Sequence, residues 1–588
     1  MNSGVDFEPA IEGTIIENEK KEQIKEPLMP LWSECGPLKS LEELDIVIDT
    51  PPAWLSNIIP LEKRDETVVQ NVLSDCHSKI SNYQSRPRLD AKFVPKTLVC
   101  HDYKGGYLED RHLIVELDTG NQYTFYNWSH IDIFVYFSHN FITIPPLCWI
   151  NAAHQKGVKI LGTFITEWDE GIAICKDIFK DMSTMQSLIK KLCKITEMFK
   201  LDGWLLNIEN KLEDTTILKE FVKELTEQLH SINDETLVIW YDSILENGKL
   251  LWQNELNEKN LCFFERCDGI FLNYVWTEET LLQSIKMAKE RSLDIYVGID
   301  IFGRNTFGGG HFNTYKAAEV IRRHGLSMAI FAPGWTHESI VHTEKDSISL
   351  MEHFFNKDCA FWNSLWPYLY THPITKYFQT SFYKGAASNR FSISLQETQL
   401  SKIVHPKYSY LVPNYAEIPT LERKCHCIRL DYNDDTCTCL INKQGMSSDI
   451  IIHNLFICNI EASGEVIVYF KKKCKPFGIL GLRILTCLKN GSRHVITLNG
   501  RKKEKLIQNC SVTQVNPLSE ETDLFKIFKK QQQVVEGDSE IMVYTFSIGP
   551  SYILEIGAIL EEGDAVCLES FGIEPSGEKN IVLNKELV

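Results

Sequence analysis

The chain has 588 residues, enough for roughly two to four domains of ordinary size. Apolar residues make up 44% and charged residues 24%, the balance of a globular protein rather than a disordered or fibrous one. No apolar run approaches the ~20 residues that span a bilayer, which excludes a transmembrane protein. The net charge of −18 argues against a broadly basic surface for nucleic acid. We therefore expect neither a membrane nor a nucleic acid as partner.

The first residues and the cysteines indicate the compartment. Residues 1–30 are rich in Glu and Lys and lack the apolar core of a secretory signal, so we expect a cytosolic protein. Most of the 18 cysteines stand singly in apolar runs, as do Cys193, Cys262 and Cys458. In a reducing cytosol such cysteines are expected to be free thiols.

Four further cysteines form two Cys-x-Cys pairs, Cys425 with Cys427 and Cys437 with Cys439. Two such pairs supply enough thiolates to hold zinc. Alternatively, they lie on the two strands of a β-hairpin, where alternate residues share a buried face. We favour the hairpin and expect no bound metal, although the sequence leaves zinc open.

Residues 1–90 are predicted to be a polar, partly ordered leader. Within it, one short helix is expected to begin at Leu41. Ser40 is a suitable N-cap, and Glu43 follows it three residues later, as in a capping box.

Residues 91–385 are predicted to form a closed (β/α)₈ barrel. Strand-type runs alternate there with helix-type runs, which indicates a parallel sheet, and eight repeats in about 250 residues are typical of this barrel. The strand candidates are Ile131–Ser138, Val158–Thr166, Gly203–Glu209, Leu237–Asp242, Gly269–Trp276, Ile295–Phe302, Met328–Pro333 and a weaker Phe378–Tyr383. The helix candidates are Ile178–Phe199, Asp214–Ile232, Thr277–Arg291 and Thr314–His324. The competing open doubly wound sheet usually has a Gly-x-Gly-x-x-Gly turn after its first strand, which is missing here.

Residues 386–588 lose the helical period and show short alternating runs separated by turns. This pattern predicts an all-β accessory region of one or two β-sandwiches. The fold class is therefore α/β, with a TIM barrel followed by a β-sandwich region.

Barrel enzymes place their active sites at the carboxyl ends of the strands, so catalytic residues are expected there. Because side chains alternate along a strand, Leu205, Asn207 and Glu209 are expected to face the barrel axis. The intervening residues, which are expected to face the helices, are Trp204, Leu206 and Ile208. An amide and a carboxylate thus point into one pocket at the barrel mouth.

Aromatic residues gather at the same predicted strand ends. Indole and phenol rings stack on the C–H faces of sugars, while acidic and amide groups pair with sugar hydroxyls. The aromatic residues concerned are Trp168, Tyr241, Tyr274, Trp276 and Trp335. This combination predicts a carbohydrate site.

Two routes to glycoside hydrolysis remain open from the residues alone. In the first, two carboxylates act together, and Glu209 is joined by Asp242 or Asp300. In the second, a 2-acetamido sugar attacks its own anomeric carbon and the protein only orients the acetamido group. Asn207 is suited to that task. A barrel that binds glycans without cleaving them is a third alternative.

Several sequence blocks, in order along residues 98–340, resemble the cytosolic endo-β-N-acetylglucosaminidases of glycoside hydrolase family 85. The blocks are Leu98–Asp110, Phe137–His139 with Ile144–Pro146, Leu161–Trp168, Asp202–Asn210 and Trp240–Ser243. The resemblance implies hydrolysis of the β-1,4 bond between the two core GlcNAc residues of N-glycans, through an oxazoline and without a metal or other cofactor. It implies N-glycans of glycoproteins or free oligosaccharides as substrates, and we expect a monomer.

The same resemblance assigns roles to single residues. It implies Glu209 as general acid and base, Asn207 as the residue that holds the acetamido group, and Tyr241 as their neighbour in the catalytic subsite. The residues expected to bind the glycan around them are Trp168, Trp252, Asn273, Trp276, Asp300 and Trp335.

Overall fold

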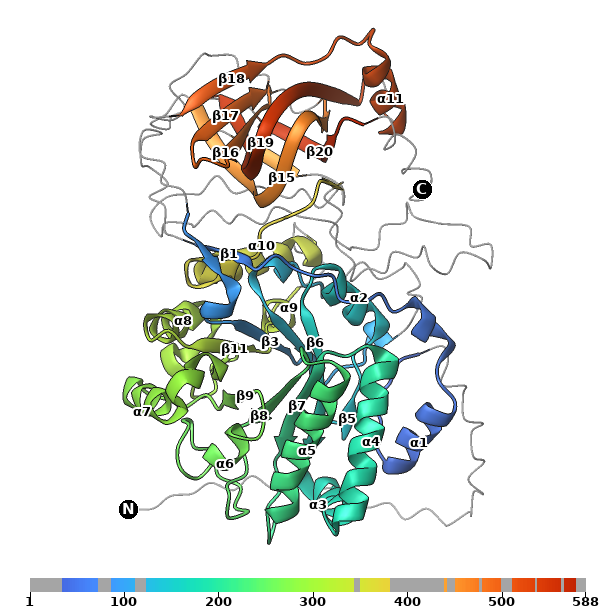
Figure 1. Ribbon diagram of the computed structural model, residues 1–588, viewed down its shortest axis with the longest axis vertical. Coiled ribbons are helices and arrows are strands. Elements are labelled where there is room, and N and C mark those ends of the chain that lie inside the picture. The colour runs from blue at the N-terminus through green and yellow to red at the C-terminus, as the bar shows by residue number, and fades with distance from the viewer. Residues whose placement is uncertain are drawn as a thin grey trace, which may run out of the picture.

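The computed structural model describes residues 34–71, 86–111, 123–342, 349–380, 438–441, 450–474, 478–498, 510–532, 534, 537–561 and 565–577. These residues build a helix-covered barrel and, beyond one end of it, a β-region (Figure 1). None of the helices in these ranges is long and apolar enough to cross a bilayer.

The barrel is closed by eight parallel strands, as predicted. Strand β4 pairs with both β3 and β6, and β3 pairs with β11, so the ring has no open edge. The strands in ring order are β3 (Thr97–His101), β4 (Ile133–Tyr136), β6 (Lys159–Thr166), β7 (Gly203–Ile208), β8 (Leu237–Tyr241), β9 (Gly269–Leu272), β10 (Ile295–Asp300) and β11 (Ser327–Phe331). The short strand β5 (Ile142–Thr143) lies antiparallel against β6.

The predicted strands were wrong at both ends of the barrel. Its first strand is β3, which the strand count missed, and the weak candidate Phe378–Tyr383 is not part of it. Strand β3 is buried at every position, so it shows no alternation of apolar and polar residues. Residues Phe378–Thr380 do form a strand, β13, but it pairs with β20 (Ala565–Pro575) in the β-region. Local sequence favours a strand without specifying its partner.

Helices cover the outside of the ring. Helix α5 (Thr216–Ile232) is typical, since it buries Leu218, Leu225 and Leu229 along one face. The predicted helix Ile178–Phe199 is divided at Asp181, whose carboxylate accepts the Thr184 amide and starts a new helix. The helices are α2 (Leu147–Gln155), α3 (Trp168–Ile178), α4 (Met182–Phe199), α6 (Leu261–Phe264), α7 (Glu278–Ala288), α8 (Thr314–Arg323), α9 (Trp335–Glu338) and α10 (Leu350–Leu365).

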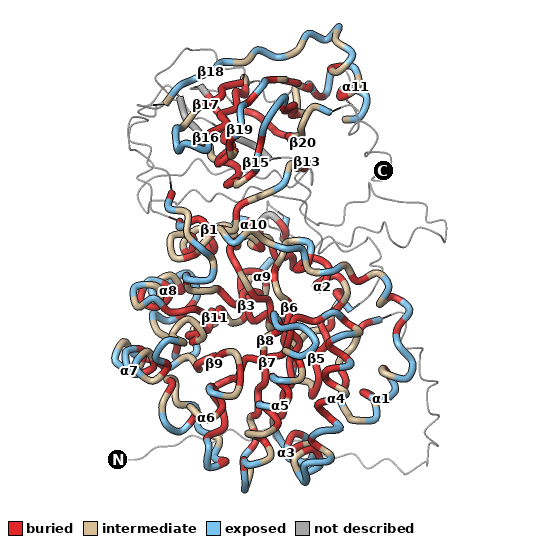
Figure 2. The backbone as a smooth tube through the Cα atoms, viewed as in Figure 1, coloured by how far each residue is buried: buried red, intermediate tan, exposed pale blue. Residues whose placement is uncertain are grey.

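The two faces of strand β7 belong to different cores, which confirms the predicted alternation. Leu205 packs inside the ring with Leu161, Ile165 and Ile239. The intervening residues pack between the ring and the helices, and they are Trp204, Leu206 and Ile208. Figure 2 shows this strand buried along its length. The interior of the ring is thus a packed core and not a pore.

Part of the predicted leader is folded against the barrel. Helix α1 (Leu41–Asp49) begins where predicted, and the Ser40 hydroxyl accepts the Glu43 amide at 3.3 Å. Strand β1 (Thr67–Gln70) pairs with β2 (Arg88–Asp90) on one side and with β12 (Tyr370–Thr371) on the other. This small sheet therefore connects the segment before the barrel, which holds β1 and β2, with the segment after it, which holds β12.

Among its described residues, the β-region consists of strands and one helix, α11 (Asp523–Gln531). Its strands form one connected sheet, in which β17 and β18 are parallel and the other pairs antiparallel. Its core strands β15 and β19 pair over most of their length. Besides β13 and β20, the strands are β14 (Thr438–Ile441), β15 (Ile450–Lys473), β16 (Gly481–Leu488), β17 (Arg493–Leu498), β18 (Ser511–Val515) and β19 (Ser539–Glu561).

Only some of the cysteines for which predictions were made lie among the described residues. Cys193, Cys262 and Cys458 are free thiols, as expected, whereas Cys567 is part of a disulfide. Three cysteines of the Cys-x-Cys pairs, Cys425, Cys427 and Cys437, lie outside the described residues. Within the described ranges no group of three or more His, Cys, Asp and Glu side chains is arranged to hold a metal ion.

The guanidinium of Arg88 ties the barrel to the β-region. It donates to the carbonyls of Cys458 at 2.7 Å and Leu554 at 3.3 Å. In Figure 1 helix α3, which begins at the carboxyl end of β6, lies at the opposite end of the barrel from the β-region. The carboxyl ends of the barrel strands therefore face away from the β-region.

Candidate active site

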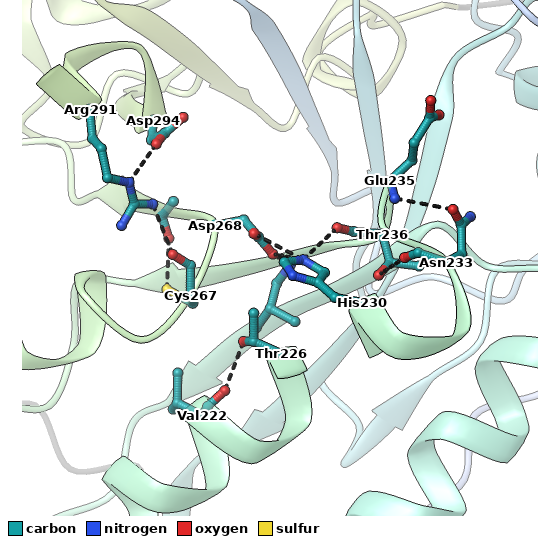
Figure 3. A network of polar contacts seen from close by, with 12 residues as sticks. Val222, Thr226, His230, Asn233, Glu235, Thr236, Cys267, Asp268, Arg291 and Asp294 are labelled. Carbon is teal, nitrogen blue, oxygen red and sulfur yellow. Dashed lines mark hydrogen bonds and ion pairs between the residues drawn. The ribbon is translucent and has the colours of Figure 1, made fainter. Parts of the chain in front are cut away.

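Two polar clusters lie at opposite ends of the barrel, and only one of them is suited to chemistry. Figure 3 shows the cluster at the amino ends of β8 and β9, where Asp268 lies beside His230. Asp268 also accepts the Val238 amide, and Arg291 donates to Asp294 and to the Cys267 carbonyl. Each of these groups holds a strand end or a loop. Residues at this end of a barrel normally serve stability.

At the carboxyl end, Asn207 and Glu209 come together as predicted. Asn207 is the next-to-last residue of β7, and Glu209 directly follows the strand. Asn207 Nδ2 donates to Glu209 Oε1 at 3.2 Å. Asn207 is 4% exposed, and its carbonyl oxygen is buried without a hydrogen-bond partner among the residues that the structure describes. A buried acceptor left unpaired costs free energy. It is a suitable acceptor for an N–H group brought by a ligand.

The surroundings of Glu209 favour its protonated form. Partial burial raises the pKa of Glu209, and the negative charge of Glu167 raises it further. The hydrogen bond from Asn207 and the charge of His139 lower that pKa, but they do not outweigh the burial. A carboxylic acid with a raised pKa is suited to give up a proton in the transition state.

Tyr241 lies at the end of β8 and starts a short chain of hydrogen bonds. Its hydroxyl donates to Asn273 Oδ1 at 2.9 Å, and Asn273 Nδ2 donates to Asn254 Oδ1 at 2.8 Å. Burial raises the pKa of Tyr241, and the nearby charge of Glu209 adds to this effect. The Tyr241 hydroxyl therefore keeps its proton beside Glu209.

Asp242, a candidate second carboxylate, is engaged in holding a loop. It is fully buried and accepts the backbone amides of Gln253 at 3.1 Å and Asn254 at 2.7 Å, together with the Asn260 side chain at 3.0 Å. Burial raises the pKa of Asp242 to about 6. The carboxylate thus fixes the loop that carries Trp252.

Asp300, the other candidate, is 1% exposed and is paired with Arg304. It accepts Arg304 Nε at 2.7 Å and Nη2 at 3.2 Å, as well as the Phe302 amide. Both aspartates thus have their oxygens occupied by protein donors. This arrangement weakens the two-carboxylate alternative, and it speaks against a direct contact between Asp300 and a glycan.

The predicted tryptophans divide into exposed and buried ones. Trp168 is 66% exposed at the start of α3, and Trp252 is 39% exposed in the loop after β8. Trp276 is 3% exposed, stacks on Phe307 and donates to the Gly298 carbonyl at 2.8 Å. Its ring is therefore part of the core, which corrects the expectation of a sugar-binding face.

Trp335 needs the same correction. Its ring is 7% exposed, is stacked on His311 at 4.9 Å between ring centres and is covered by the Lys357 ammonium at 4.1 Å. Trp335 supports the rim of the mouth from inside. Of the predicted aromatic contacts, Trp168 and Trp252 are the ones with accessible rings.

His139 and Glu167 form a pair at the barrel mouth that was not predicted from the sequence. His139 Nδ1 lies 2.8 Å from Glu167 Oε1, and the pair is close enough to Glu209 to influence its pKa. His139 follows β4 and Glu167 follows β6, and these two strands are neighbours in the ring. This neighbourhood is the signal that could have brought the two residues together.

A closed barrel whose mouth holds an acid of raised pKa, an amide and exposed indole rings is typical of barrel glycoside hydrolases. Residues 107–390 match the sequence model described as glycosyl hydrolase family 85. This part of the chain therefore resembles glycosyl hydrolase family 85 in its sequence.

Curated relatives carry one recurring description. The chain is 44% identical over 327 residues to the cytosolic endo-beta-N-acetylglucosaminidase of Mus musculus, a match that covers 55% of this chain and 43% of the relative. For the human protein of that name the figures are 45%, 52% and 40%, and for cytosolic endo-beta-N-acetylglucosaminidase 2 of Arabidopsis thaliana they are 42%, 52% and 43%. The chain thus spans less than half the length of these relatives.

The fold is shared with a solved structure. The Endo-D glycoside hydrolase domain of Streptococcus pneumoniae superposes with a TM-score of 0.61 at 14% identity, covering 93% of this chain and 84% of that one. The likeness includes both the barrel and the β-region.

Proposed function

We propose that this chain is an endo-β-N-acetylglucosaminidase that cleaves N-glycans between their two core GlcNAc residues. One GlcNAc stays on the protein, or at the reducing end of a free oligosaccharide, and the rest of the glycan is released. The catalytic residues are Glu209, Asn207 and Tyr241, and the reaction needs no cofactor. The relatives are named cytosolic, and we place this enzyme in the cytosol as well.

The pairing of Asn207 with Glu209 carries the proposal. An enzyme that uses two carboxylates needs a second free acid at the mouth. Asp242 and Asp300 are both occupied by protein donors, and Glu167 is paired with His139. What stands beside Glu209 is an amide with an unpaired, buried oxygen among the described residues. Such an oxygen suits the N–H of a 2-acetamido sugar, and a sugar of this kind carries its own nucleophile.

In the first step the acetamido carbonyl oxygen attacks C1 of its own sugar. The bond from C1 to the glycosidic oxygen breaks, and Glu209 donates its proton to that oxygen as the second GlcNAc leaves. Asn207 Oδ1 accepts the acetamido N–H and so holds the group in line for attack. The positive charge that develops on the oxazoline ring is stabilised by this contact and by the Glu209 carboxylate that results.

In the second step Glu209 removes a proton from water, and the water oxygen attacks C1 from the side that the leaving sugar vacated. The bond from C1 to the oxazoline oxygen breaks and restores the acetamido group. Two inversions give overall retention of configuration. Glu209 has regained its proton for the next cycle.

Digestion of a high-mannose glycopeptide, followed by mass spectrometry, tests the proposal. We expect a peptide that keeps a single GlcNAc, together with a free glycan one GlcNAc shorter. With Glu209→Gln in parallel, we expect no product, because general acid help is worth about 10²–10⁴-fold. Circular dichroism should show the variant folded, since Glu209 lies at the mouth and not in the core.

Other outcomes would point elsewhere. Cleavage by the Glu209→Gln variant would sink the assignment of the acid. An intact glycopeptide, tested also against free oligosaccharides, would contradict the endoglycosidase proposal. Binding of these glycans without cleavage would favour the glycan-binding barrel.

A further inference from the structure

A second set of side chains stands beside the catalytic pair, and we refer to His139, Glu167 and Trp168 as the rim cluster. The imidazole Nδ1 of His139 lies 2.8 Å from Glu167 Oε1. The same imidazole stacks on the Trp168 indole at 5.5 Å between ring centres, with 28° between the planes. Phe137 packs edge-on against the imidazole at 5.3 Å. The ring of His139 is therefore fixed from three directions.

At the start of α3, Glu167 and Trp168 have conformations that formation of the helix does not require. Glu167 is the N-cap of α3, yet its side chain makes no capping bond and turns to His139 instead. Trp168 has a φ of +53°, an uncommon conformation for a bulky residue. It is nonetheless 66% exposed, so burial does not compensate for the conformation. Backbone strain of this kind tends to collect at functional sites.

One hydrogen bond links the rim cluster to the catalytic strand. The side-chain amide of Asn210 donates to the Trp168 carbonyl at 2.9 Å, and Asn210 is the residue directly after Glu209. The rim cluster also acts on the catalytic acid through charge. The negative charge of Glu167 raises the pKa of Glu209, and the positive charge of His139 lowers it. The hydrogen bond to Glu167 raises the pKa of His139, and the charges of Asp102 and Glu209 act in the same direction.

The order of strands assigns the rim cluster to one side of Glu209. Around the ring, β8 and β6 flank β7. Tyr241 on β8 and Asn207 on β7 mark the subsite of the sugar that carries the reacting acetamido group. Glu167 and Trp168 follow β6, and His139 follows β4, on the other side of Glu209. Because Glu209 protonates the oxygen between two sugars, the residues on this other side face the sugar that leaves.

We propose that the rim cluster binds the leaving N-acetylglucosamine, with the Trp168 indole stacked on its ring and His139 Nε2 hydrogen-bonded to one of its hydroxyls. The inference rests on the proposed function. His139 Nε2 has no protein partner among the described residues, and the His139 side chain is 43% exposed. With Nδ1 directed at Glu167, Nε2 donates when the ring is charged and accepts when it is neutral. Glu167 is a positioning residue that acts through His139.

A substrate that lacks the leaving sugar can distinguish binding of that sugar from other roles of the rim cluster. The oxazoline of a high-mannose glycan enters the reaction after the leaving sugar has gone, and water converts it to the free glycan. When N-acetylglucosamine is added, it occupies the leaving-sugar site and attacks the oxazoline in the reverse of the first step. The acceptor KM for N-acetylglucosamine therefore reports directly on that site.

The experiment compares wild type with Trp168→Ala, His139→Ala and Glu167→Gln in three assays. These are cleavage of a high-mannose glycopeptide, hydrolysis of the glycan oxazoline in water, and transfer from that oxazoline to N-acetylglucosamine. For Trp168→Ala and His139→Ala we expect the acceptor KM to rise about tenfold, the loss of one good contact. Glycopeptide kcat/KM should fall by a similar factor, while oxazoline hydrolysis changes less than about twofold.

Two controls make the result specific. Trp168→Phe keeps a flat ring and should recover most of the acceptor affinity. Phe93→Ala removes an aromatic ring that is 79% exposed just before β3, at the other end of the barrel, and should leave all three assays unchanged.

Equal losses in oxazoline hydrolysis and glycopeptide cleavage would overturn the inference, since the cluster would then serve the other sugar or the fold. An unchanged acceptor KM would overturn it too. A wild-type protein that cleaves no glycan and consumes no oxazoline would instead reject the proposed function, and the inference with it.

Discussion

Asn207 and Glu209 show how little sequence is needed to place two reacting groups. Two residues along a strand return a side chain to the same face, so one amide and one acid meet at 3.2 Å. The side chains between and before them, Ile208 and Leu206, pack in the outer core and hold the strand in place. A shift of one residue in this strand would exchange the catalytic pair for apolar side chains.

We predict that Asn207→Ala impairs formation of the oxazoline much more than its use. In the first step the Asn207 amide must hold a mobile acetamido group in line for attack, whereas in a preformed oxazoline that ring is already closed. We expect glycopeptide cleavage to fall about 100-fold, the usual cost of a lost transition-state contact. Hydrolysis of a preformed glycan oxazoline, followed by mass spectrometry, should fall by less than about tenfold. Equal losses on the two substrates would argue against the orienting role.

The pH dependence of kcat/KM should report on Glu209. The first step needs the protonated acid, so activity is expected to fall as the pH rises through the raised pKa of Glu209. The charge of Glu167 contributes to that raised value and exceeds the opposing influence of His139. Glu167→Gln should therefore move the alkaline limb of the profile to lower pH. A shift to higher pH would contradict this order of influences.

At the scale of elements, the loop after β8 illustrates how a buried carboxylate shapes a binding surface. Asp242 accepts hydrogen bonds from Gln253, Asn254 and Asn260, which lie 11 to 18 positions further along the chain. These bonds hold in place a segment that has neither helix nor strand. Trp252 lies in this segment, with its ring 39% exposed. The accessible ring thus depends on a buried acid.

Asp242→Ala should both destabilise the protein and disturb this loop. It leaves the half-buried amides of Gln253 and Asn254 and the buried side chain of Asn260 without their acceptor, at a cost of about 2–4 kcal/mol in the free energy of unfolding. We also expect a higher KM for the glycopeptide, because Trp252 loses its support. Urea unfolding and steady-state kinetics measure the two effects.

Glu246→Ala is the matched control in the same loop. Glu246 is half exposed and pairs with Lys219 at 3.4 Å, so its loss should cost less than about 1 kcal/mol. If both variants unfold alike, the anchoring role of Asp242 is wrong.

The elements also show how far the sequence could be interpreted. Seven of the eight barrel strands, the capped helix after Ser40 and the facing of Asn207 and Glu209 followed from local periodicity and strand alternation. Strand β3 was missed because it is buried on both faces, and β13 was assigned to the barrel because pairing depends on distant β20. Whether a single ring is buried also depends on residues distant in the sequence. Trp276 lies in the core because Phe307 stacks on it and the Gly298 carbonyl accepts its indole N–H.

At the scale of the whole molecule, one arginine joins two structural units. Arg88 lies on β2, in chain that precedes the barrel, yet it satisfies carbonyls of Cys458 and Leu554 in the β-region. Nearby, Val69, Trp366 and Ile457 form a small apolar cluster between the same units. The segment before the barrel therefore holds both parts together.

Arg88→Ala should loosen this junction. Loss of hydrogen bonds from a charged donor to buried carbonyls is expected to cost about 2–3 kcal/mol. We expect a lower melting temperature in calorimetry and a broader transition, as the two units begin to unfold separately. Lys92→Ala, which removes an exposed ion pair with Glu66, should change stability by less than about 1 kcal/mol. Identical melting curves for wild type and Arg88→Ala would contradict the role of the arginine.

Closure of the ring has a consequence for synthesis of the protein. Strand β3 pairs with β11, so residues 97–101 must wait for residues 327–331 before the barrel can close. Ribosomes add about 5–20 residues per second, and the intervening stretch therefore takes about 10–50 s. During that time the nascent sheet has two open edges, which are sites for mispairing between chains. The yield of native protein should accordingly depend on translation rate and temperature more steeply than its final stability would suggest.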